Sequence, residues 1–369
     1  MAKFSKSSLL IIIFAAAVVL AAVAGGLLWW NFRAGRTTAP LPAVQLIASG
    51  LEVPWALDFL PDGSIILTER PGRIRIVDAE EGLLPDPLLT IAEVAPRGEG
   101  GLLGIATHPD FARNGFIYVY YTYQQDGGLR NKVVRYTMQG SELLQPTTIV
   151  ADIPGASIHN GGRVSFGPDG LLYITTGDAS NAELAQDLDS LAGKILRLNP
   201  DGSIPADNPF PGSPVYSYGH RNPQGLAWDD AGRLWAVEHG SSATDELNLI
   251  EPGRNYGWPT IRGDESRPGM QSPVMQSGPV TWAPSGLAFL EGSLWFGGLR
   301  SQSLFEVRMA GGTMTLRQHL ERQYGRLRAA VAGPDGYLYV TTSNRDGRGL
   351  PVAEDDQVLK IDLSQLAQP

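Results

Sequence analysis

A turn followed by a short β-rich run occurs six times from residue 44 onward, and this repeat constrains the fold more than any other feature of the chain. The runs are rich in β-branched and aromatic residues, and no stretch keeps a helical period over three turns. The six units are Pro61-Asp62-Gly63-Ser64 before IILTER, Asn114-Gly115 before FIYVYYT, Pro168-Asp169-Gly170 before LLYITTGD, Asp229-Asp230-Ala231-Gly232 before RLWAVEHG, Glu291-Gly292 before SLWFGG, and Pro334-Asp335-Gly336 before YLYVTTSN.

The spacing of these units indicates the architecture. They recur at intervals of about 44 to 61 residues, and a period in this range with several strands per unit is typical of a β-propeller rather than a sandwich. Six units over about 325 residues leave about 54 residues for each, enough for four short strands. We therefore predict an all-β fold, a six-bladed β-propeller over residues 44–369. A propeller must close its ring, so we expect VQLIAS near residue 44 to pair with the blade that ends in QVLKIDL.

The composition excludes several classes of protein. Hydrophobic residues make up 43% and charged residues 18% of the chain, which does not suit a disordered or coiled-coil protein. The formal net charge of -9 lacks the cationic footprint of a nucleic-acid binder, so we expect no nucleic-acid partner. Because the chain has no cysteine, any metal must be bound through oxygen or histidine.

The N-terminal segment indicates export. Leu9 to Trp30 is a run of 22 residues without a charge, flanked on both sides by basic residues, and this length spans a bilayer. A cleavable signal peptide is the alternative, because residues 22–24 have the small-residue pattern that signal peptidase accepts. We expect residues 1–33 to form a membrane anchor, or a signal helix, and residues 34–43 a linker. The following domain is then periplasmic or extracytoplasmic, either anchored to the inner membrane or secreted after cleavage.

A histidine and an aspartate are candidates for acid–base chemistry. His159 lies in the segment SIHNGGR, immediately before a predicted strand, where a loop would bring it to the mouth of the propeller channel. A neutral imidazole accepts a hydroxyl proton at physiological pH, and Asp178, which ends the next strand, could orient the ring. The alternative is a hydrogen-bonded loop histidine without a catalytic role.

Two further segments suit an oxygen-rich, anionic ligand. Arg221, Asn222 and Gln224 lie together in GHRNPQG, where a guanidinium and two amides can bind a planar ligand or cap backbone groups. Arg326 and Arg328 alternate, so in a strand both point to the same face. Such a pair indicates a carboxylate or phosphate ligand, or else ion pairs with Asp or Glu elsewhere in the chain.

The stretch EHGSSATDE, residues 238–246, combines carboxylates with loop carbonyls and continues to NYGW. Ca²⁺ takes six to eight oxygen ligands in flexible geometry, so this stretch is a candidate for a calcium site. A solvated acidic turn is the alternative.

Six segments together resemble a known family. In chain order they are GEGGLLGIATHPDF, IHNGGRVSFGPDGLLYITTGD, LAGKILRLNPDG, YGHRNPQGLAW, DELNLIEPGRNYGWP and RLRAAVAGPDG. This set resembles the soluble quinoprotein glucose dehydrogenase and aldose sugar dehydrogenase family over about residues 44 to 363, and GHRNPQG and NYGWP are its most specific parts. The resemblance implies a six-bladed propeller that binds pyrroloquinoline quinone (PQQ) with calcium and oxidises the C1 hydroxyl of aldoses to lactones.

The resemblance also implies roles for single residues. His159 matches the general base and Asp178 the aspartate that supports it, while Arg221 with calcium polarises the quinone carbonyl that receives the hydride. The matching cofactor contacts are Glu99, His159, Arg221, Asn222, Gln224, Arg300, Arg326 and Arg328. Two of these positions depart from the commonest pattern, because Glu99 replaces the glutamine of the glucose dehydrogenases and Arg300 replaces a lysine.

The implied metal ligands fall in two pairs. Gly240 and Ser241 match the backbone carbonyls that bind the cofactor's calcium, with Ser241 in place of a proline. Glu246 and Tyr256 match a second, structural calcium site. No haem motif or cysteine is present, so the electrons are expected to pass to an external acceptor, a respiratory quinone or a cytochrome.

Two other classes fit the predicted fold. A calcium-dependent lactonase is also a six-bladed propeller, but it has no need of Arg221, Arg326 and Arg328 around a tricarboxylate. A non-catalytic propeller that binds a protein or glycan would keep the fold and lose the chemistry. The presence of His159, Asp178 and the arginines favours the dehydrogenase.

Overall fold

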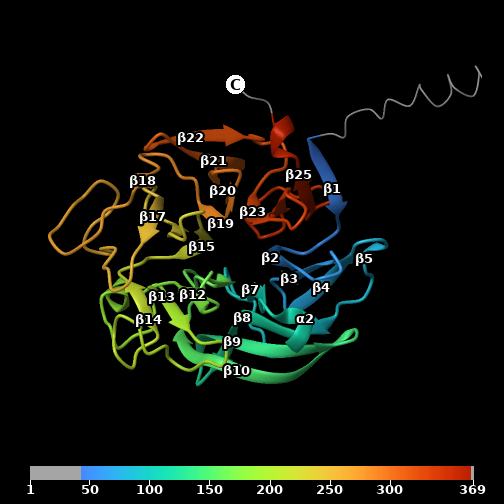
Figure 1. Cartoon of the computed structure of the whole chain (residues 1–369), viewed down its shortest axis with the longest axis horizontal. Helices are drawn as coiled ribbons and strands as arrows, with labels where there is room; N and C mark the ends of the chain where they lie inside the picture. The colour runs from blue at the N-terminus through green and yellow to red at the C-terminus, as the bar shows by residue number, and fades with distance from the viewer. Residues whose placement is uncertain (1–42, 367–369) are drawn as a thin grey trace, which may run out of the picture. The chain divides into compact units, whose positions relative to one another are not determined.

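The computed structural model describes residues 43–366, which form a ring of six antiparallel β-sheets around a central channel (Figure 1). This arrangement confirms the six-bladed β-propeller. The expected membrane anchor or signal segment, residues 1–33, and residues 34–42 of the expected linker lie outside the described residues.

The blades follow one another along the chain, and the first strands of neighbouring blades contact one another around the channel. Grouped by blade, the strands are β2 (Pro54–Phe59), β3 (Ile65–Glu69), β4 (Arg73–Asp78), β5 (Gly82–Leu83) and β6 (Leu89–Thr90); β7 (Leu102–Thr107), β8 (Phe116–Gln125), β9 (Gly128–Gln139) and β10 (Glu142–Pro154); β11 (Val164–Phe166), β12 (Leu172–Thr176), β13 (Lys194–Leu198) and β14 (Val215–Tyr218); β15 (Pro223–Trp228), β16 (Leu234–Glu238), β17 (Glu246–Ile250) and β18 (Met275–Gln276); β19 (Pro284–Leu290), β20 (Ser293–Gly298), β21 (Ser303–Ala310) and β22 (Thr313–His319); and β23 (Leu327–Ala332), β24 (Leu338–Thr342) and β25 (Val358–Ile361), joined by β1 (Val44–Ala48).

The six predicted turn-and-strand units are the turns between first and second strands, together with the second strands themselves, β3, β8, β12, β16, β20 and β24. In the Pro-Asp-Gly turns the aspartate side chain accepts a backbone hydrogen bond two residues ahead, as from Ser64 N to Asp62 Oδ1 at 2.9 Å. The glycine that follows has a positive φ, +88° at Gly63, which a residue with a side chain rarely adopts. Turn chemistry therefore fixes the start of each second strand.

The ring closes as expected. The N-terminal strand β1 pairs antiparallel with β25, with Val44 opposite Ile361 and Leu46 opposite Leu359. The last blade therefore contains strands from both ends of the described chain. The pairing of β1 with β25 closes the ring.

Helical structure within residues 43–366 consists of three short pieces, α2 (Phe111–Asn114), η1 (Ala182–Ala185) and η2 (Leu363–Gln365). In this part of the chain, no helix is long and apolar enough to cross a membrane.

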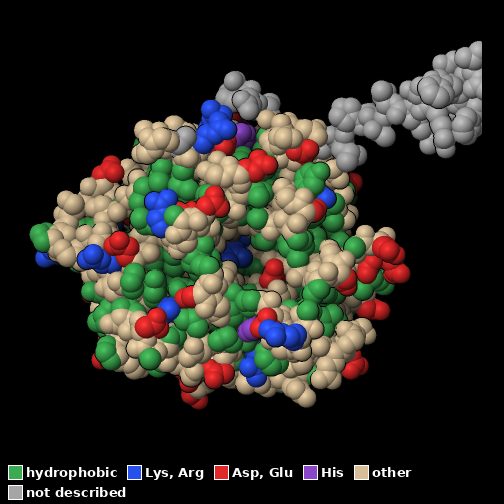
Figure 2. Space-filling view, in the orientation of Figure 1, with side chains coloured by type: hydrophobic (Ala, Val, Ile, Leu, Met, Phe, Trp, Pro, Cys, Tyr) green, Lys and Arg blue, Asp and Glu red, His purple; other side chains and the backbone are tan. Residues whose placement is uncertain are grey.

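The core lies between neighbouring blades, where strand residues with apolar side chains pack in clusters that include Trp55, Tyr118 and Tyr120. The centre of the ring is hollowed (Figure 2), and the two ends of the channel differ in chemistry. Charged and polar residues gather where the first strands begin and the second strands end. At the opposite end, formed by the last residues of the first strands, most lining residues have apolar side chains, with polar atoms exposed between them.

Candidate active site

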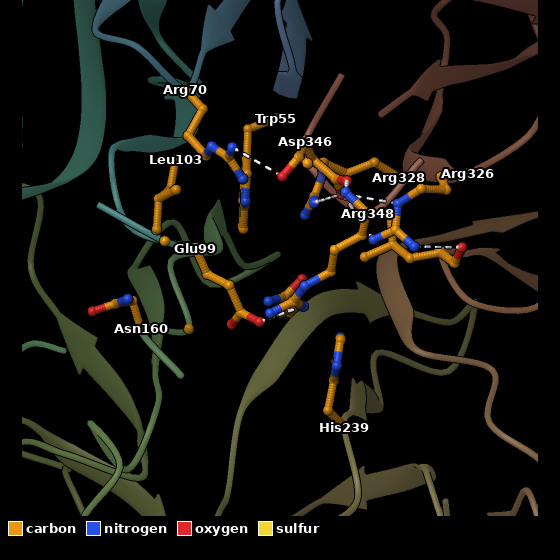
Figure 3. A pocket seen from close by; sticks show the side chains of 15 residues that line it. Trp55, Arg70, Glu99, Leu103, Asn160, His239, Arg326, Arg328, Asp346 and Arg348 are labelled. Carbon is orange, nitrogen blue, oxygen red and sulfur yellow. Dashed lines mark hydrogen bonds and ion pairs between the residues drawn. The ribbon is translucent and has the colours of Figure 1, made fainter. Parts of the chain in front are cut away.

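A cavity of about 160 Å³ opens at the polar end of the channel. Figure 3 shows its side chains converging from strands and loops of several blades. The charged and polar lining residues are Arg70, Glu99, Asn160, Gln224, His239, Arg326, Arg328, Asp346 and Arg348, with Trp55, Leu103 and Leu299 as apolar neighbours.

Three arginines in this cavity meet one aspartate. Arg326 Nη2 lies 2.7 Å and Arg328 Nη2 3.5 Å from the same oxygen, Oδ2 of Asp346. Arg70 Nη2 donates to the backbone oxygen of Asp346 at 3.3 Å. The same-face arrangement expected for Arg326 and Arg328 is therefore present, and a single carboxylate balances only part of the positive charge.

Burial makes this excess of positive charge more costly, because Arg326 and Arg328 are both shielded from solvent. It lowers the pKa of Arg328 to about 10, an effect that Asp346 opposes and Arg326 reinforces. Burial alone would raise the pKa of Asp346, but Arg328 and Arg326 hold it below its usual value. Buried cations in excess of buried anions favour an anionic ligand, because such a ligand restores the pairing that solvent would otherwise supply.

His159 and Asp178 form the expected pair. His159 Nδ1 lies 2.8 Å from Asp178 Oδ1, and Asp178 Oδ2 accepts a hydrogen bond from Trp258 Nε1 at 2.9 Å. A carboxylate accepts hydrogen bonds, so in the neutral imidazole Nδ1 carries the proton and Nε2 keeps its lone pair. Within residues 43–366, no side chain or backbone group is hydrogen-bonded to His159 Nε2. The imidazole is thus oriented as a proton acceptor.

The backbone around His159 is tightly constrained. Its φ is +61°, and its N–H donates to Glu99 Oε2 at 3.1 Å. Gly177 allows the loop to approach β12 closely, because a Cβ there would lie only 2.0 Å from His159 O. A side chain at position 177 would displace the histidine, so this glycine fixes where the imidazole lies.

Buried polar atoms without partners surround the same region. The backbone N–H of Arg221 donates to Glu238 Oε2 at 2.8 Å and its Nη1 to His239 O at 3.3 Å, but its Nε has no partner. Asn222 Oδ1 accepts from Gly161 N at 2.9 Å, while Asn222 Nδ2 is unpartnered. His239 Nε2 is also unpartnered. Native proteins satisfy nearly all buried polar groups, so three unpartnered atoms in one region indicate that a ligand or ordered water binds there.

Of the remaining expected cofactor contacts, two line the cavity and one does not. Gln224 lines the cavity, with its Oε1 accepting from Ser285 Oγ at 3.2 Å. Glu99 lines it too, and its Oε1 forms a 2.7 Å ion pair with Arg348 Nη1 (Figure 3). Arg300 is exposed and is not among the lining residues, although its neighbour Leu299 is. A cofactor contact by Arg300 stays a prediction.

The four residues expected to bind calcium line one small neighbouring cavity: Gly240, Ser241, Glu246 and Tyr256. Burial, reinforced by Glu238, raises the pKa of Glu246 to about 8. The Tyr256 hydroxyl donates to Leu249 O at 2.6 Å. The group of Tyr256 that is left as a calcium ligand is therefore its backbone carbonyl. No group of three or more His, Asp or Glu side chains in the described part of the chain is arranged to hold a metal.

Sequence reasoning missed several lining residues, among them Arg70, His239, Asp346 and Arg348. A usable signal existed for two of them. Arg70 directly follows β3 and His239 directly follows β16, just as the predicted Asp178 closely follows β12. In these three blades, the positions just after the second strand therefore mark the polar end of the channel.

Fold and site together define a class of protein, a six-bladed propeller in which a half-buried histidine pairs with a buried aspartate beside a cationic cavity at one end of the channel. The family model described as Glucose / Sorbosone dehydrogenase matches residues 51–352, and the chain belongs to this family. The resemblance found in the sequence is thereby confirmed, and the family is one of oxidoreductases that act on sugars.

Similar proteins with known names are also sugar dehydrogenases. The chain is 35% identical to aldose sugar dehydrogenase YliI of Escherichia coli, over 84% of this chain and 92% of the relative. It is 40% identical to quinoprotein glucose dehydrogenase B of Acinetobacter calcoaceticus, over 59% of this chain and 52% of that protein. The solved PQQ-bound aldose sugar dehydrogenase of Streptomyces coelicolor superposes with a TM-score of 0.82 and 44% identity, covering 87% of this chain and 99% of that one.

Proposed function

We propose that this protein oxidises aldose sugars at the C1 hydroxyl to lactones, with PQQ and Ca²⁺ as cofactors. The observation that carries the proposal is the cluster of three arginines at Asp346, where Arg326 and Arg328 share its single carboxylate and Arg70 donates to its backbone oxygen. A flat ligand with three carboxylates supplies the negative charge that this cavity lacks. The PQQ-bound relative from Streptomyces coelicolor supports the same cofactor.

The residues present fit such a ligand. Arg326 and Arg328 would bind its carboxylates, while Arg221 Nε and Asn222 Nδ2, both without partners, would donate to its ring oxygens or nitrogens. Gln224, Glu99 and, by resemblance, Arg300 complete the proposed contacts. When bound, PQQ supplies a carbonyl that accepts two electrons as a hydride.

The chain's own contribution is to hold the sugar and move a proton. His159 Nε2 accepts the proton of the C1 hydroxyl, because Nδ1 is already bonded to Asp178. The negative charge of Asp178 stabilises the imidazolium that results. Arg221 stabilises the negative charge that develops on an oxygen near its guanidinium.

The aspartate is held in turn by Trp258, and this bond gives a testable prediction. Trp258→Phe keeps an aromatic ring beside Arg221, whose guanidinium lies 5.3 Å from the ring centroid, but removes the donor to Asp178. A hydrogen bond to a charged group is worth ~1.5–3 kcal/mol, so we expect kcat to fall about tenfold or more with KM little changed. Trp282→Phe, in a separate core cluster, is the matched control. An unchanged kcat in the Trp258 variant would show that the bond does not support the base.

Calcium is proposed at the backbone carbonyls of Gly240 and Ser241, and a second ion at Glu246 and Tyr256. A ligand that binds only the native state stabilises it by ~2.7 kcal/mol at 100 times its Kd. We therefore expect added Ca²⁺ to raise the melting temperature of the parent protein but to have a smaller effect on Glu246→Gln. The control is Glu251→Gln, since Glu251 is an exposed glutamate paired with Arg254. Equal calcium responses in all three proteins would argue against a site at Glu246.

The reduced cofactor must pass its electrons to an external acceptor, for which a respiratory quinone or a cytochrome is proposed. Residues 1–33 are proposed to place the propeller in the periplasm, as an inner-membrane anchor or as a cleaved signal.

Activity assays separate the three classes of protein. The full chain, freed of cofactor, should oxidise glucose or another aldose in a dye-reduction assay only when PQQ and Ca²⁺ are added together. A lactonase would instead hydrolyse lactones with Ca²⁺ alone, and a binding propeller would do neither. Lactone hydrolysis without dye reduction would overturn the proposed function.

A further inference from the structure

The end of the channel opposite the candidate active site holds a second cavity, of about 360 Å³. The first strand of every blade contributes two or three consecutive residues to its wall. Most of the lining residues have apolar side chains, such as Phe166, Trp228 and Phe289, although polar atoms make up about half of the exposed wall. The charged lining residues are Asp58 and Arg163.

Arg163 is buried, with 7% of its surface exposed, and it lacks an anionic partner. Its Nε donates to the carbonyl of Gln224 at 2.9 Å, and its guanidinium lies 4.5 Å from the ring centroid of Trp55. Nη2 has no hydrogen-bond partner. Burial and the like charge of Arg328 lower the pKa of Arg163 to about 9. An unpaired buried cation is costly, which is why buried charges are normally paired.

Asp58 does not serve as the counter-ion. Its Oδ2 accepts from the backbone N–H and the hydroxyl of Thr107 at 2.7 and 2.9 Å, and its Oδ1 accepts from Phe59 N at 2.8 Å. These donors are neutral and satisfy the carboxylate locally. Within residues 43–366, the positive charge of Arg163 is therefore left without a negative partner.

Trp55 separates this cation from the candidate active site. The indole lines the cavity that contains Arg326 and Arg328, whereas Arg163 stacks on Trp55 and lines the opposite cavity. A ligand at Arg163 would therefore enter by the other mouth of the ring, whose centre is hollowed (Figure 2).

We propose that this second cavity binds a small organic anion, with its carboxylate against Arg163 and its apolar body along the ends of the first strands. Charge complementarity selects the anion, and the apolar side chains in the wall favour a carboxylate with a hydrocarbon body over an inorganic ion. The site is separate from the proposed PQQ site, because the two cavities share no lining residue.

The test is calorimetric titration of the full-length protein with octanoate, with and without PQQ and Ca²⁺. We expect saturable binding at one site in both conditions, which keeps this proposal separate from the proposed function. Arg163→Gln should weaken octanoate at least tenfold. Arg113→Gln, which alters an arginine side chain that is 78% exposed, should leave the affinity unchanged.

A second variant keeps the test decisive if Arg163→Gln does not fold. Ala332→Phe narrows the cavity at a partly exposed position while keeping Arg163, and it should also weaken octanoate. Absence of saturable octanoate binding, or equal affinity in Arg163→Gln and the parent, would overturn the proposal. So would chloride that binds at the same site more tightly than octanoate.

Discussion

Replacing His159 by glutamine is expected to lower the rate of aldose oxidation by roughly 100-fold or more, the usual contribution of a positioned general base. Glutamine can still donate a hydrogen bond to Asp178, but its amide cannot take a proton from a hydroxyl at neutral pH. The fold and the affinity for PQQ should therefore stay close to those of the parent. The measurement is kcat in a dye-reduction assay at saturating PQQ, Ca²⁺ and sugar.

The matched control is His319→Gln. His319 also pairs with a carboxylate, Glu306, at 3.1 Å, but it lies in a different cavity from the candidate active site. It should have no effect on kcat. If the His159 variant keeps nearly full activity, His159 is not the base.

Replacing both Arg326 and Arg328 by alanine is expected to weaken PQQ by roughly 100- to 10⁴-fold. Each charged hydrogen bond contributes ~1.5–3 kcal/mol, and every 1.4 kcal/mol is about tenfold in Kd. The loss should exceed that from either single variant, because each arginine would bind a carboxylate of the ligand. Fluorescence or absorbance titration with PQQ gives the affinities.

Loss of these arginines also leaves Asp346 with fewer partners, so the thermal melting curve of each variant must be compared with that of the parent. Replacing both residues by lysine keeps the charge but not the bidentate geometry, and should give an intermediate affinity. Arg308→Ala is the control for a surface arginine, with 48% of that side chain exposed. Parent-like PQQ affinity in a folded double-alanine variant would remove these arginines from the cofactor site.

The sequence predicted the parts of the fold that local chemistry decides. Each turn has Gly, Asp or Asn at a position that needs it, so the starts of β3, β8, β12, β16, β20 and β24 could be located. Ring closure also followed, because a propeller has no free edge to leave between its first and last blades. The lengths of the outer strands were not predicted, since exposed positions such as those in β10 lack a clear alternation.

Site residues that belong to a local sequence motif were predicted. Contacts between segments that are far apart in the sequence were missed. His159 and Asp178 flank one hairpin, so their pairing could be expected from the order of strands. The ion pair of Glu99 and Arg348 joins positions 249 residues apart, and only the closed ring brings them together. Arg163 lies in the recognised loop, but whether its charge has a partner depends on side chains from other blades.

The most direct test of the proposed function is a titration of the cofactor-free full chain with PQQ in the presence of Ca²⁺, followed by the absorbance of the quinone. We predict saturable binding of one PQQ per chain, lost when Arg326 and Arg328 are both replaced by alanine, with dye reduction by aldose appearing in proportion to the PQQ bound. Absence of saturable binding in the parent protein, with the propeller folded and Ca²⁺ present, would contradict the proposal that this is a quinoprotein sugar dehydrogenase.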